Sequence, residues 1–288
     1  MSILKAEFID LRDVHPFVKW AGGKGQLLSE LDKSIPRQFN RYFEPFLGGG
    51  AMFIHLASKN MISTAYLSDT NEELIKTFKV VRDSVGELIG VLNQHQRGYD
   101  KNPSEYYYGL RELIQPRNDI EIAARFIALN KTCFNGLYRV NRNGKFNVPM
   151  GDYKKPLICD SSNLKKVSTM LRHSNTEVQC ADYIGMLSKA KTKDLVYLDP
   201  PYDPVSYTSD FTAYTPNGFG RENQVQLANV SKKLSDRGCF VLLSNSDTPF
   251  IRRLYSDFRI KEVNVQRAIN CKGSKRTGHK ELLISNYF

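Results

Sequence analysis

The segment RYFEPFLGGGAMFIHLAS, residues 41–58, contains the pattern from which we predict the fold. Arg41 to Phe46 is a short aromatic strand, which ends at the glycines 48–50. A helix follows from about Ala51 to Ser58. Because glycines permit a tight turn and let a ligand approach the backbone closely, the segment predicts a strand, a turn able to bind a ligand, and a helix.

The same alternation recurs along the chain. Apolar runs predict strands, and a helix begins within residues 71–73, where a polar cap precedes two acids. The other predicted elements are strands at Ile62–Ser68 (ending at Asp69), Glu177–Cys180, Asp194–Leu198 and Cys239–Leu243, a helix at Arg221–Asp236, and a terminal hairpin of Arg259–Ala268 with Lys280–Tyr287. Alternating strands and helices predict the α/β class with a doubly wound, Rossmann-like, mostly parallel sheet. Such sheets bind ligands beyond the carboxyl ends of their strands.

The composition limits the class of protein. The chain has 288 residues, 41% of them hydrophobic and 25% charged, as in an ordinary globular protein. No apolar run approaches the roughly 18 residues of a membrane helix, and the first ten residues lack the apolar core of a signal peptide. We therefore expect a cytoplasmic protein without a membrane partner. The five cysteines form no CxxC pair, so we expect reduced thiols and no metal site.

The charge and the middle of the chain indicate a polyanionic partner. Lys and Arg exceed Asp and Glu by 41 − 30 = 11, which favours nucleic acid but also fits a basic surface that serves only solubility. Residues 83–173 read as an inserted, mostly helical domain with a helix at Ile120–Asn130, and they divide a core domain of residues 1–82 and 174–288. The segment from Phe134 to Lys155 interleaves aromatic and basic residues, as nucleic-acid-binding loops do. A solvated basic loop is the alternative.

Two glycine segments are candidate ligand sites. Asp69 ends the next strand, 69 − 50 = 19 residues after Gly50, where a carboxylate holds the hydroxyls of a nucleoside ribose. Position 53 is Phe, so the third glycine of the dinucleotide pattern is missing and a nucleoside without a pyrophosphate fits better. The segment 19–25, KWAGGKG, resembles a phosphate-binding loop, but Gly25 stands where an NTPase needs Ser or Thr. Plain structural turns remain the alternative for both segments.

The most specific motif is Asp199-Pro200-Pro201-Tyr202, directly after a buried strand. The Asp199 carboxylate and the Pro200 carbonyl are acceptors, Pro201 fixes the backbone, and Tyr202 offers a flat ring. This set suits a planar exocyclic amine, whose two hydrogens need acceptors. Acceptors that grip both hydrogens favour a pyramidal nitrogen and so stabilise the transition state of its attack. A rigid turn is the alternative.

Together these residues resemble the DNA adenine-N6 methyltransferases that use S-adenosylmethionine, in particular their Dam-like, GATC-recognising group of the alpha class, which includes methylases of restriction–modification systems. The resemblance covers nearly the whole chain. It implies methyl transfer to adenine N6, at the adenine of GATC, in double-stranded DNA by base flipping, with S-adenosylhomocysteine as product. A restriction endonuclease encoded nearby would be a functional partner without direct contact; a role in repair or regulation stays open.

The resemblance also implies roles for individual residues. The catalytic residues are Asp199, Pro200, Pro201 and Tyr202. The cofactor-binding residues are Trp20, Ala21, Gly22, Gly23, Lys24, Phe46, Gly48, Gly50, Asp69, Asp182, Tyr183 and Asp199. The DNA-binding residues are Lys19, Phe134, Asn135, Leu137, Arg139, Asn141, Pro149, Tyr153 and Lys154. Arg139 is expected to read a guanine, and Asp152 stands where the Dam group tends to have a basic residue.

Other activities fit the sequence less well. Cytosine-C5 methylation needs a nucleophilic cysteine, usually after a proline, and no cysteine here follows one. Cytosine-N4 enzymes usually carry Ser at position 199, and protein-amide methyltransferases carry Asn there. A non-catalytic DNA-binding protein with the same fold would not need the intact tetrad of Asp199 to Tyr202.

Overall fold

The computed structural model of the chain describes residues 11, 13–22, 27–113, 116–205, 219–265 and 279–287. Of the predicted site residues, Gly23 and Lys24 lie outside these ranges, as do residues 266–268 of the predicted hairpin.

The described residues form one seven-stranded sheet in the order β3-β2-β1-β4-β5-β7-β6. Its strands are β1 (Tyr42–Glu44), β2 (Ala65–Asp69), β3 (Thr176–Cys180), β4 (Leu195–Leu198), β5 (Phe240–Ser246), β6 (Arg259–Val265) and β7 (His279–Ser285). The first five strands in this order are parallel, and β7 runs antiparallel to both β5 and β6. The predicted α/β class, the mostly parallel sheet and the terminal hairpin are confirmed.

The strand order reverses direction at β1. The chain goes outward from β1 to β2 and β3, and then returns to β4 on the other side of β1. The carboxyl ends of β1 and β4 are therefore neighbours at the point where an open α/β sheet forms its ligand crevice. The two motifs singled out in the sequence follow these two strands.

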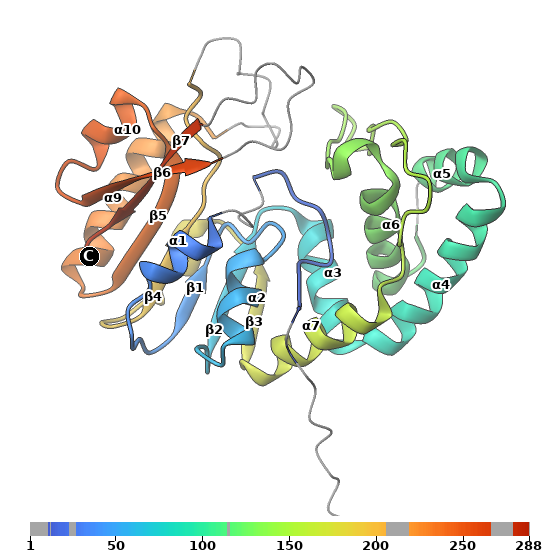
Figure 1. Cartoon of the computed structure of the whole chain (residues 1–288), viewed down its shortest axis with the longest axis horizontal. Helices are drawn as coiled ribbons and strands as arrows, with labels where there is room; N and C mark the ends of the chain where they lie inside the picture. The colour runs from blue at the N-terminus through green and yellow to red at the C-terminus, as the bar shows by residue number, and fades with distance from the viewer. Residues whose placement is uncertain are drawn as a thin grey trace, which may run out of the picture.

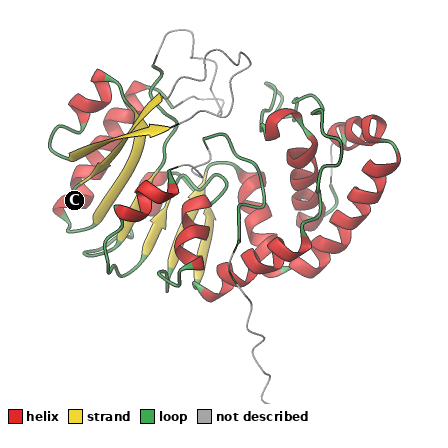
Figure 2. Cartoon of the chain, in the orientation of Figure 1, coloured by secondary structure: helices red, strands yellow, loops and turns green. Residues whose placement is uncertain are grey.

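Helices cover both faces of the sheet (Figures 1 and 2). Alternate residues of a strand point to opposite faces, so Leu195 and Tyr197 of β4 join one hydrophobic cluster while Val196 and Leu198 join the other. The first cluster includes side chains of α1 (Leu28–Lys33), α2 (Ala51–Ser58), α3 (Glu72–Asp83) and α7 (Ser161–His173). The second includes side chains of α8 (Tyr183–Leu187), α9 (Arg221–Asp236) and α10 (Pro249–Leu254).

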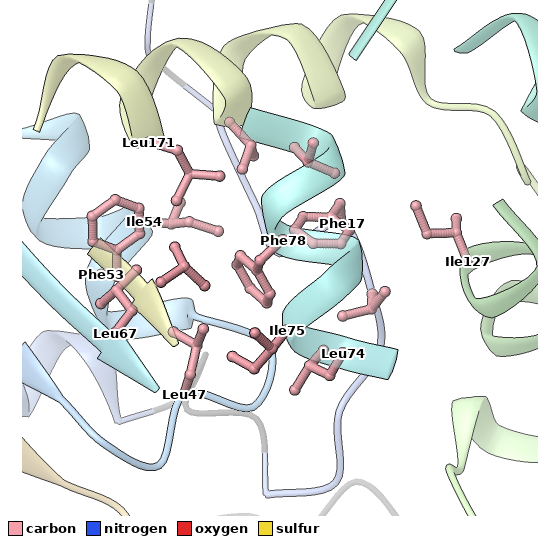
Figure 3. Close-up of a cluster of buried hydrophobic side chains, with 14 of the residues drawn as sticks. Phe17, Leu47, Phe53, Ile54, Leu67, Leu74, Ile75, Phe78, Ile127 and Leu171 are labelled. Carbon is pink, nitrogen blue, oxygen red and sulfur yellow. The ribbon is translucent and has the colours of Figure 1, made fainter. Parts of the chain in front are cut away.

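A further group of helices lies beside the sheet, on the right in Figure 1. It consists of α4 (Val85–Lys101), α5 (Pro103–Glu112) and α6 (Asp119–Thr132). Helix α6 packs on both α3 and α4, and its Ile127 belongs to the same buried cluster as Phe78 of α3 and Phe53 of α2 (Figure 3). The core is thus continuous from the sheet to these helices. That residues 83–173 act as a separate recognition domain stays a prediction.

The helix bounds at Ala51–Ser58 and Arg221–Asp236 match the prediction, whereas strand bounds differ. β1 ends at Glu44, two residues early, because Pro45 has no N–H to continue the ladder. β2 begins at Ala65 rather than Ile62, since Ala65 is the first residue opposite both Tyr42 and Thr176. β5 continues to Ser246 because β7 supplies partners beyond Leu243.

Candidate active site

The glycine turn after β1 is held by backbone geometry that only glycine adopts readily. Gly48 and Gly50 have φ angles of 48° and 68°, in the left-handed region. A Cβ atom on Gly48 would lie 2.6 Å from Cδ1 of Trp20. The Trp20 ring therefore lies directly on the turn, and the predicted cofactor segments around residues 20 and 48 are brought together.

Asp69, at the end of β2, links the turn to the next strand. Its Oδ2 accepts from the Gly48 N–H at 3.0 Å and its Oδ1 from the Asn71 N–H at 2.9 Å. Burial raises the pKa of Asp69 above its ordinary value, and the backbone hydrogen bonds partly offset this. Since a carboxylate has about four acceptor positions, these two bonds leave acceptors for the hydroxyls of a ligand.

An aromatic cluster lies beside the turn. Phe46 stacks on Tyr183 with 5.4 Å between ring centroids, and Phe219 meets Phe46 edge-on at 5.7 Å. The Tyr183 hydroxyl donates to Gln226 at 2.9 Å. Asp182 accepts from the Gly185 N–H and so caps helix α8. The predicted cofactor residues Phe46, Asp182 and Tyr183 thus form one wall beside the carboxyl end of β1.

Asp199, directly after β4, is oriented by a chain of hydroxyl groups. The Ser244 hydroxyl of β5 donates to Oδ1 of Asp199 at 2.7 Å. Because that bond uses the only Ser244 hydroxyl hydrogen, the Tyr197 hydroxyl, 3.2 Å from Ser244 Oγ, acts as donor to it. The order Tyr197, Ser244, Asp199 fixes one carboxylate oxygen as an acceptor.

The backbone after Asp199 is held by buried amides. The Pro201 carbonyl accepts from Gln224 of α9 at 2.8 Å, and the Asp203 N–H donates to Asn245 at 3.1 Å. Gln224 and Asn245 also bond each other at 3.1 Å. No donor from the described residues lies on the Pro200 carbonyl. Of the two proline carbonyls, the one predicted to accept from a ligand is thus the one left open by these residues.

Two further carboxyl groups lie at this edge. The Tyr202 hydroxyl donates to Oε2 of Glu281 on β7 at 2.9 Å. Glu44, at the end of β1, is only 3% exposed and accepts from the Tyr42 hydroxyl at 2.9 Å and the Phe53 N–H at 3.1 Å. Burial, with a smaller contribution from the charge of Asp199, raises the pKa of Glu44 to about 8. Glu44 is therefore mostly protonated at neutral pH.

The predicted DNA-contacting segment forms an irregular hairpin of residues 133–151, the recognition hairpin. Isolated bridges pair Cys133 with Met150 and Val140 with Phe146, and the Phe134 N–H donates to the Pro149 carbonyl at 2.9 Å. The Tyr107 hydroxyl of α5 donates to the Val148 carbonyl at 2.8 Å and so ties the hairpin to the helices.

Most of the predicted DNA contacts are exposed around this hairpin. Arg139 donates through Nε to Oδ1 of Asn147 at 2.7 Å, which fixes the plane of its guanidinium. The Lys19 ammonium lies over the Tyr153 ring, 4.0 Å from its centroid. Exposed side chains are those of Lys19, Phe134, Asn135, Arg139, Asn141, Pro149, Asp152 and Lys154, while Leu137 and Tyr153 are half-buried. The structure thus groups these residues on the recognition hairpin and beside it. They belong to other elements than Asp199, which follows β4.

An aromatic stack joins the two regions. Trp20, which lies on the glycine turn, stacks on Tyr138 of the recognition hairpin with 5.9 Å between centroids. The Tyr138 hydroxyl donates to Glu73 of α3 at 3.0 Å. The predicted cofactor segment and the recognition hairpin therefore share a contact that neither motif alone predicts.

Sequence reasoning missed Ser244, Glu281, Gln224 and Asn245, and did not assign a state to Glu44. The signal for Ser244 and Asn245 was present, because both follow the predicted strand Cys239–Leu243 at its carboxyl end. Nothing local marks Glu281, which stands at the start of a strand. The prediction that the site needs no metal stays a prediction; within the described ranges, no three His, Cys, Asp or Glu side chains are grouped as metal ligands. Among the described helices, none has the length and apolar character to cross a membrane.

Comparison with known proteins gives consistent results. Residues 20–269 match the family model of the D12 class N6 adenine-specific DNA methyltransferases. The chain is 42% identical to the type II methyltransferase M.MjaIII of Methanocaldococcus jannaschii, over 96% of this chain and 100% of that protein. It is 40% identical to the type II methyltransferase M1.LlaDCHI of Lactococcus lactis subsp. cremoris, over 100% and 99% of the two chains. It is 34% identical to the DNA adenine methylase of Escherichia coli K12, over 93% of each chain.

Proposed function

Because the chain belongs to the D12 class of N6 adenine-specific DNA methyltransferases and is itself a site-specific adenine methyltransferase, we propose that it transfers a methyl group from S-adenosylmethionine to an adenine flipped out of duplex DNA, within GATC. The observation that carries the proposal is the Asp199–Tyr202 tetrad at the carboxyl end of β4, next to the glycine turn after β1.

The residues around the glycine turn fit a nucleoside cofactor. Asp69 keeps acceptor positions for ribose hydroxyls, and Phe46 and Tyr183 form an apolar wall for a purine. The Trp20 ring occupies the space that a Cβ on Gly48 would need, so the ring and the turn form one surface beside Asp69. When bound, S-adenosylmethionine supplies an electrophilic methyl group on a sulfonium, and the methyl acceptor is the adenine N6 nitrogen.

The tetrad acts on the N6 amine. One N6 hydrogen is held by the Asp199 carboxylate and the other by the Pro200 carbonyl, which draws the nitrogen toward a pyramidal geometry and localises its lone pair. Ser244 keeps Asp199 in place as an acceptor before the substrate arrives, so little reorganisation is needed. Tyr202 stacks on the adenine ring. The proton that N6 loses leaves after the attack, so Asp199 need not act as a base in that step.

Base flipping follows from the position of the tetrad. It lies at the carboxyl end of β4, at the edge where an open α/β sheet binds its ligands, and an N6 amine inside the base stack cannot reach a group held there. The target nucleotide therefore rotates out of the duplex. The recognition hairpin then stays in the groove and holds the rest of the site, while Lys154 and the net charge of +11 attract the phosphates.

The recognition hairpin supports the proposed recognition site. Arg139 presents a guanidinium whose plane is fixed by Asn147, and bidentate pairing of Arg with guanine O6 and N7 is the commonest specific base contact. Phe134 is 44% exposed at the start of the hairpin and acts as the wedge at the flipped base. Leu137 and Pro149 contact thymine methyl groups, and Asn135 and Asn141 contact the strand beside the site.

The biological role follows the relatives with the highest identities given above, which are named as type II methyltransferases. In such a role the methyl group shields the site from a nuclease that cuts only unmodified DNA. This partnership acts through DNA and needs no contact between the two proteins.

The test is to methylate an unmodified plasmid in vitro with the purified enzyme and S-adenosylmethionine and to map every N6-methyladenine by sequencing. The proposal expects modification at the adenine of GATC and nowhere else. Modification confined to another sequence would reject the proposed site while leaving the chemistry intact, and modification of cytosine would reject the chemistry.

A further inference from the structure

We propose that Glu281 is a positioning residue, which holds the Tyr202 ring in the orientation in which it stacks on the target adenine. The inference rests on the proposed stacking role of Tyr202. It assigns a function in the reaction to a residue of the antiparallel hairpin at the other end of the chain.

The sheet topology brings Glu281 to the active edge. Strands β4 and β5 are parallel, so their carboxyl ends lie at the same edge. Strand β7 runs antiparallel to β5, and its third residue, Glu281, is paired with Ser246, the last residue of β5. The beginning of β7 thus lies where β4 and β5 end. A residue near the start of one strand thus meets the loop that follows another strand, 79 positions earlier in the chain.

The contact between the two side chains is specific. The Tyr202 hydroxyl donates to Oε2 of Glu281 at 2.9 Å. Burial and the neighbouring carboxylates of Asp199 and Glu281 raise the pKa of Tyr202 well above its ordinary value, so the hydroxyl keeps its proton and remains a donor. A hydrogen bond to a carboxylate is stronger than one between neutral groups.

The backbone on both sides of Tyr202 is already fixed. Gln224 holds the Pro201 carbonyl, and Asn245 holds the Asp203 N–H. These bonds act on the backbone and not on the ring. The Tyr202 hydroxyl, with which Ser244 also interacts, lies on the long axis of the ring, so its bond to Glu281 fixes the direction in which the ring projects from the backbone. With Glu281 in place, the ring is held at both ends before a base arrives.

The experiment is a double-mutant cycle with Glu281→Ala and Tyr202→Phe, each alone and combined. Single-turnover methylation of a GATC duplex is measured at saturating DNA and S-adenosylmethionine, and DNA affinity is measured separately. A duplex with 2-aminopurine at the target position reports stacking, because its emission rises on flipping and is quenched on an aromatic ring. Glu281→Gln keeps an acceptor in place. The matched control is Glu262→Ala on the neighbouring strand β6. Glu262 forms ion pairs with Lys280 at 2.7 Å and with Arg252 at 2.6 Å.

Glu281→Ala is expected to lower the single-turnover rate about tenfold, the size expected for losing one hydrogen bond to a charged acceptor. Its DNA affinity stays within about twofold and its 2-aminopurine signal is brighter than that of the unchanged enzyme. Tyr202→Phe lowers the single-turnover rate by a similar factor, and the double variant lowers it by no more than either single variant does. Glu281→Gln recovers most of the rate, and Glu262→Ala behaves as the unchanged enzyme.

A loss from Glu281→Ala that adds fully to that of Tyr202→Phe would overturn the inference, because Glu281 would then act on something other than the Tyr202 hydroxyl. An unchanged rate would overturn it as well. If Glu281→Ala does not fold, Tyr202→Phe decides alone: a rate equal to that of the unchanged enzyme contradicts the inference. Failure of the proposed function is distinguishable, because the unchanged enzyme would then leave the GATC duplex without N6-methyladenine, whereas failure of the stacking role alone would leave Tyr202→Ala fully active.

Discussion

The carboxamide of Asn130 is hydrogen-bonded to both backbone polar groups of Lys19. Its Oδ1 accepts from the Lys19 N–H at 2.7 Å, and its Nδ2 donates to the Lys19 carbonyl at 2.8 Å and to the Gly136 carbonyl at 3.0 Å. Asn130 is 3% exposed near the end of α6. One side chain therefore joins the segment that leads into Trp20, the proposed cofactor contact, to the helical turn Phe134–Gly136 at the start of the recognition hairpin.

Asn130→Ala should loosen both regions at once. It removes the partner of three backbone groups, of which the Gly136 carbonyl is buried and the two groups of Lys19 are partly buried, and a buried group costs about 1–3 kcal/mol when no water replaces the lost partner. We expect a clear loss of stability in urea, weaker binding of S-adenosylmethionine by calorimetry, and reduced discrimination against sites with one changed base pair.

The chain provides a control of the same chemistry. Asn163 of α7 accepts from the His15 N–H at 3.1 Å and donates to the His15 carbonyl at 2.9 Å. Asn163→Ala should lower stability but leave cofactor affinity and site discrimination unchanged in the folded enzyme. Equal functional losses in both variants would show that Asn130 has only a general structural role.

Gly48→Ala should impair cofactor binding. Its φ of 48° disfavours any residue with a Cβ, by about 1–2 kcal/mol, and the new atom would also meet the Trp20 ring. The turn must then shift, which separates the Gly48 N–H from Asp69. We expect the dissociation constant for S-adenosylmethionine to rise by about tenfold or more.

Gly90→Ala on the exposed side of α4 is the control, because nothing lies within 4 Å of a Cβ there. It should stabilise the protein by about 0.5–1 kcal/mol and leave cofactor binding as it is. Unchanged affinity in Gly48→Ala would contradict the proposed role of the turn.

Glu44 makes stability depend on pH. Its pKa of about 8 in the folded protein exceeds the ordinary value of 4.5. Between these two values the folded state holds a proton that the unfolded chain has released. The contribution of this group to stability therefore falls as pH rises from 4.5 to 8, by up to about 1.4 kcal/mol per pH unit.

Glu44→Gln removes this titration while keeping an acceptor for Tyr42 and Phe53. The stability of the variant relative to the unchanged protein should increase between pH 5.5 and pH 8, measured by urea unfolding at each pH. A difference that does not vary with pH would show that Glu44 ionises normally. Asp199→Asn should lower the pKa of Glu44, because the charge of Asp199 helps to raise it.

Arg139 and Lys154 should differ in what they contribute to DNA binding. Arg139→Ala should relax selectivity at one guanine by about 1–3 kcal/mol, since it removes the proposed base contact. Lys154→Ala should weaken binding to all sequences alike and reduce the slope of log K against log salt by about one. Competition binding with duplexes that differ by one base pair, at several salt concentrations, separates these two effects. If Arg139→Ala loses the same affinity for every sequence, guanine readout by Arg139 is contradicted.

The sequence predicted those parts of the fold and site whose signals are local. The start of the helix at Ala51–Ser58 is marked by the glycines before it. The glycine turn and the Asp199–Tyr202 tetrad are each an unbroken run of residues, so each can be recognised without knowledge of the fold. The predicted parallel pairing of the strands then implied that both motifs lie at the carboxyl edge of the sheet.

The parts that were missed depend on pairing between distant segments. Ser244 is 45 positions from Asp199, and Glu281 is 79 from Tyr202. Their contacts require the registers of β4 with β5 and of β5 with β7, which a single sequence does not specify. The state of Glu44 depends on complete burial by α2 and on Asp199, and neither can be read from residues 41–46.

The central claim is that Asp199 grips the adenine N6 amine during methyl transfer. The most direct measurement is transfer of a radiolabelled methyl group from S-adenosylmethionine to a GATC duplex, followed by nucleoside analysis. The unchanged enzyme and Asp257→Ala, which alters an exposed carboxylate paired with Lys232, should both yield labelled N6-methyladenine. Asp199→Ala should lose at least about a thousandfold in rate while its DNA affinity stays within about threefold. Labelled N6-methyladenine at the normal rate from Asp199→Ala would contradict the account.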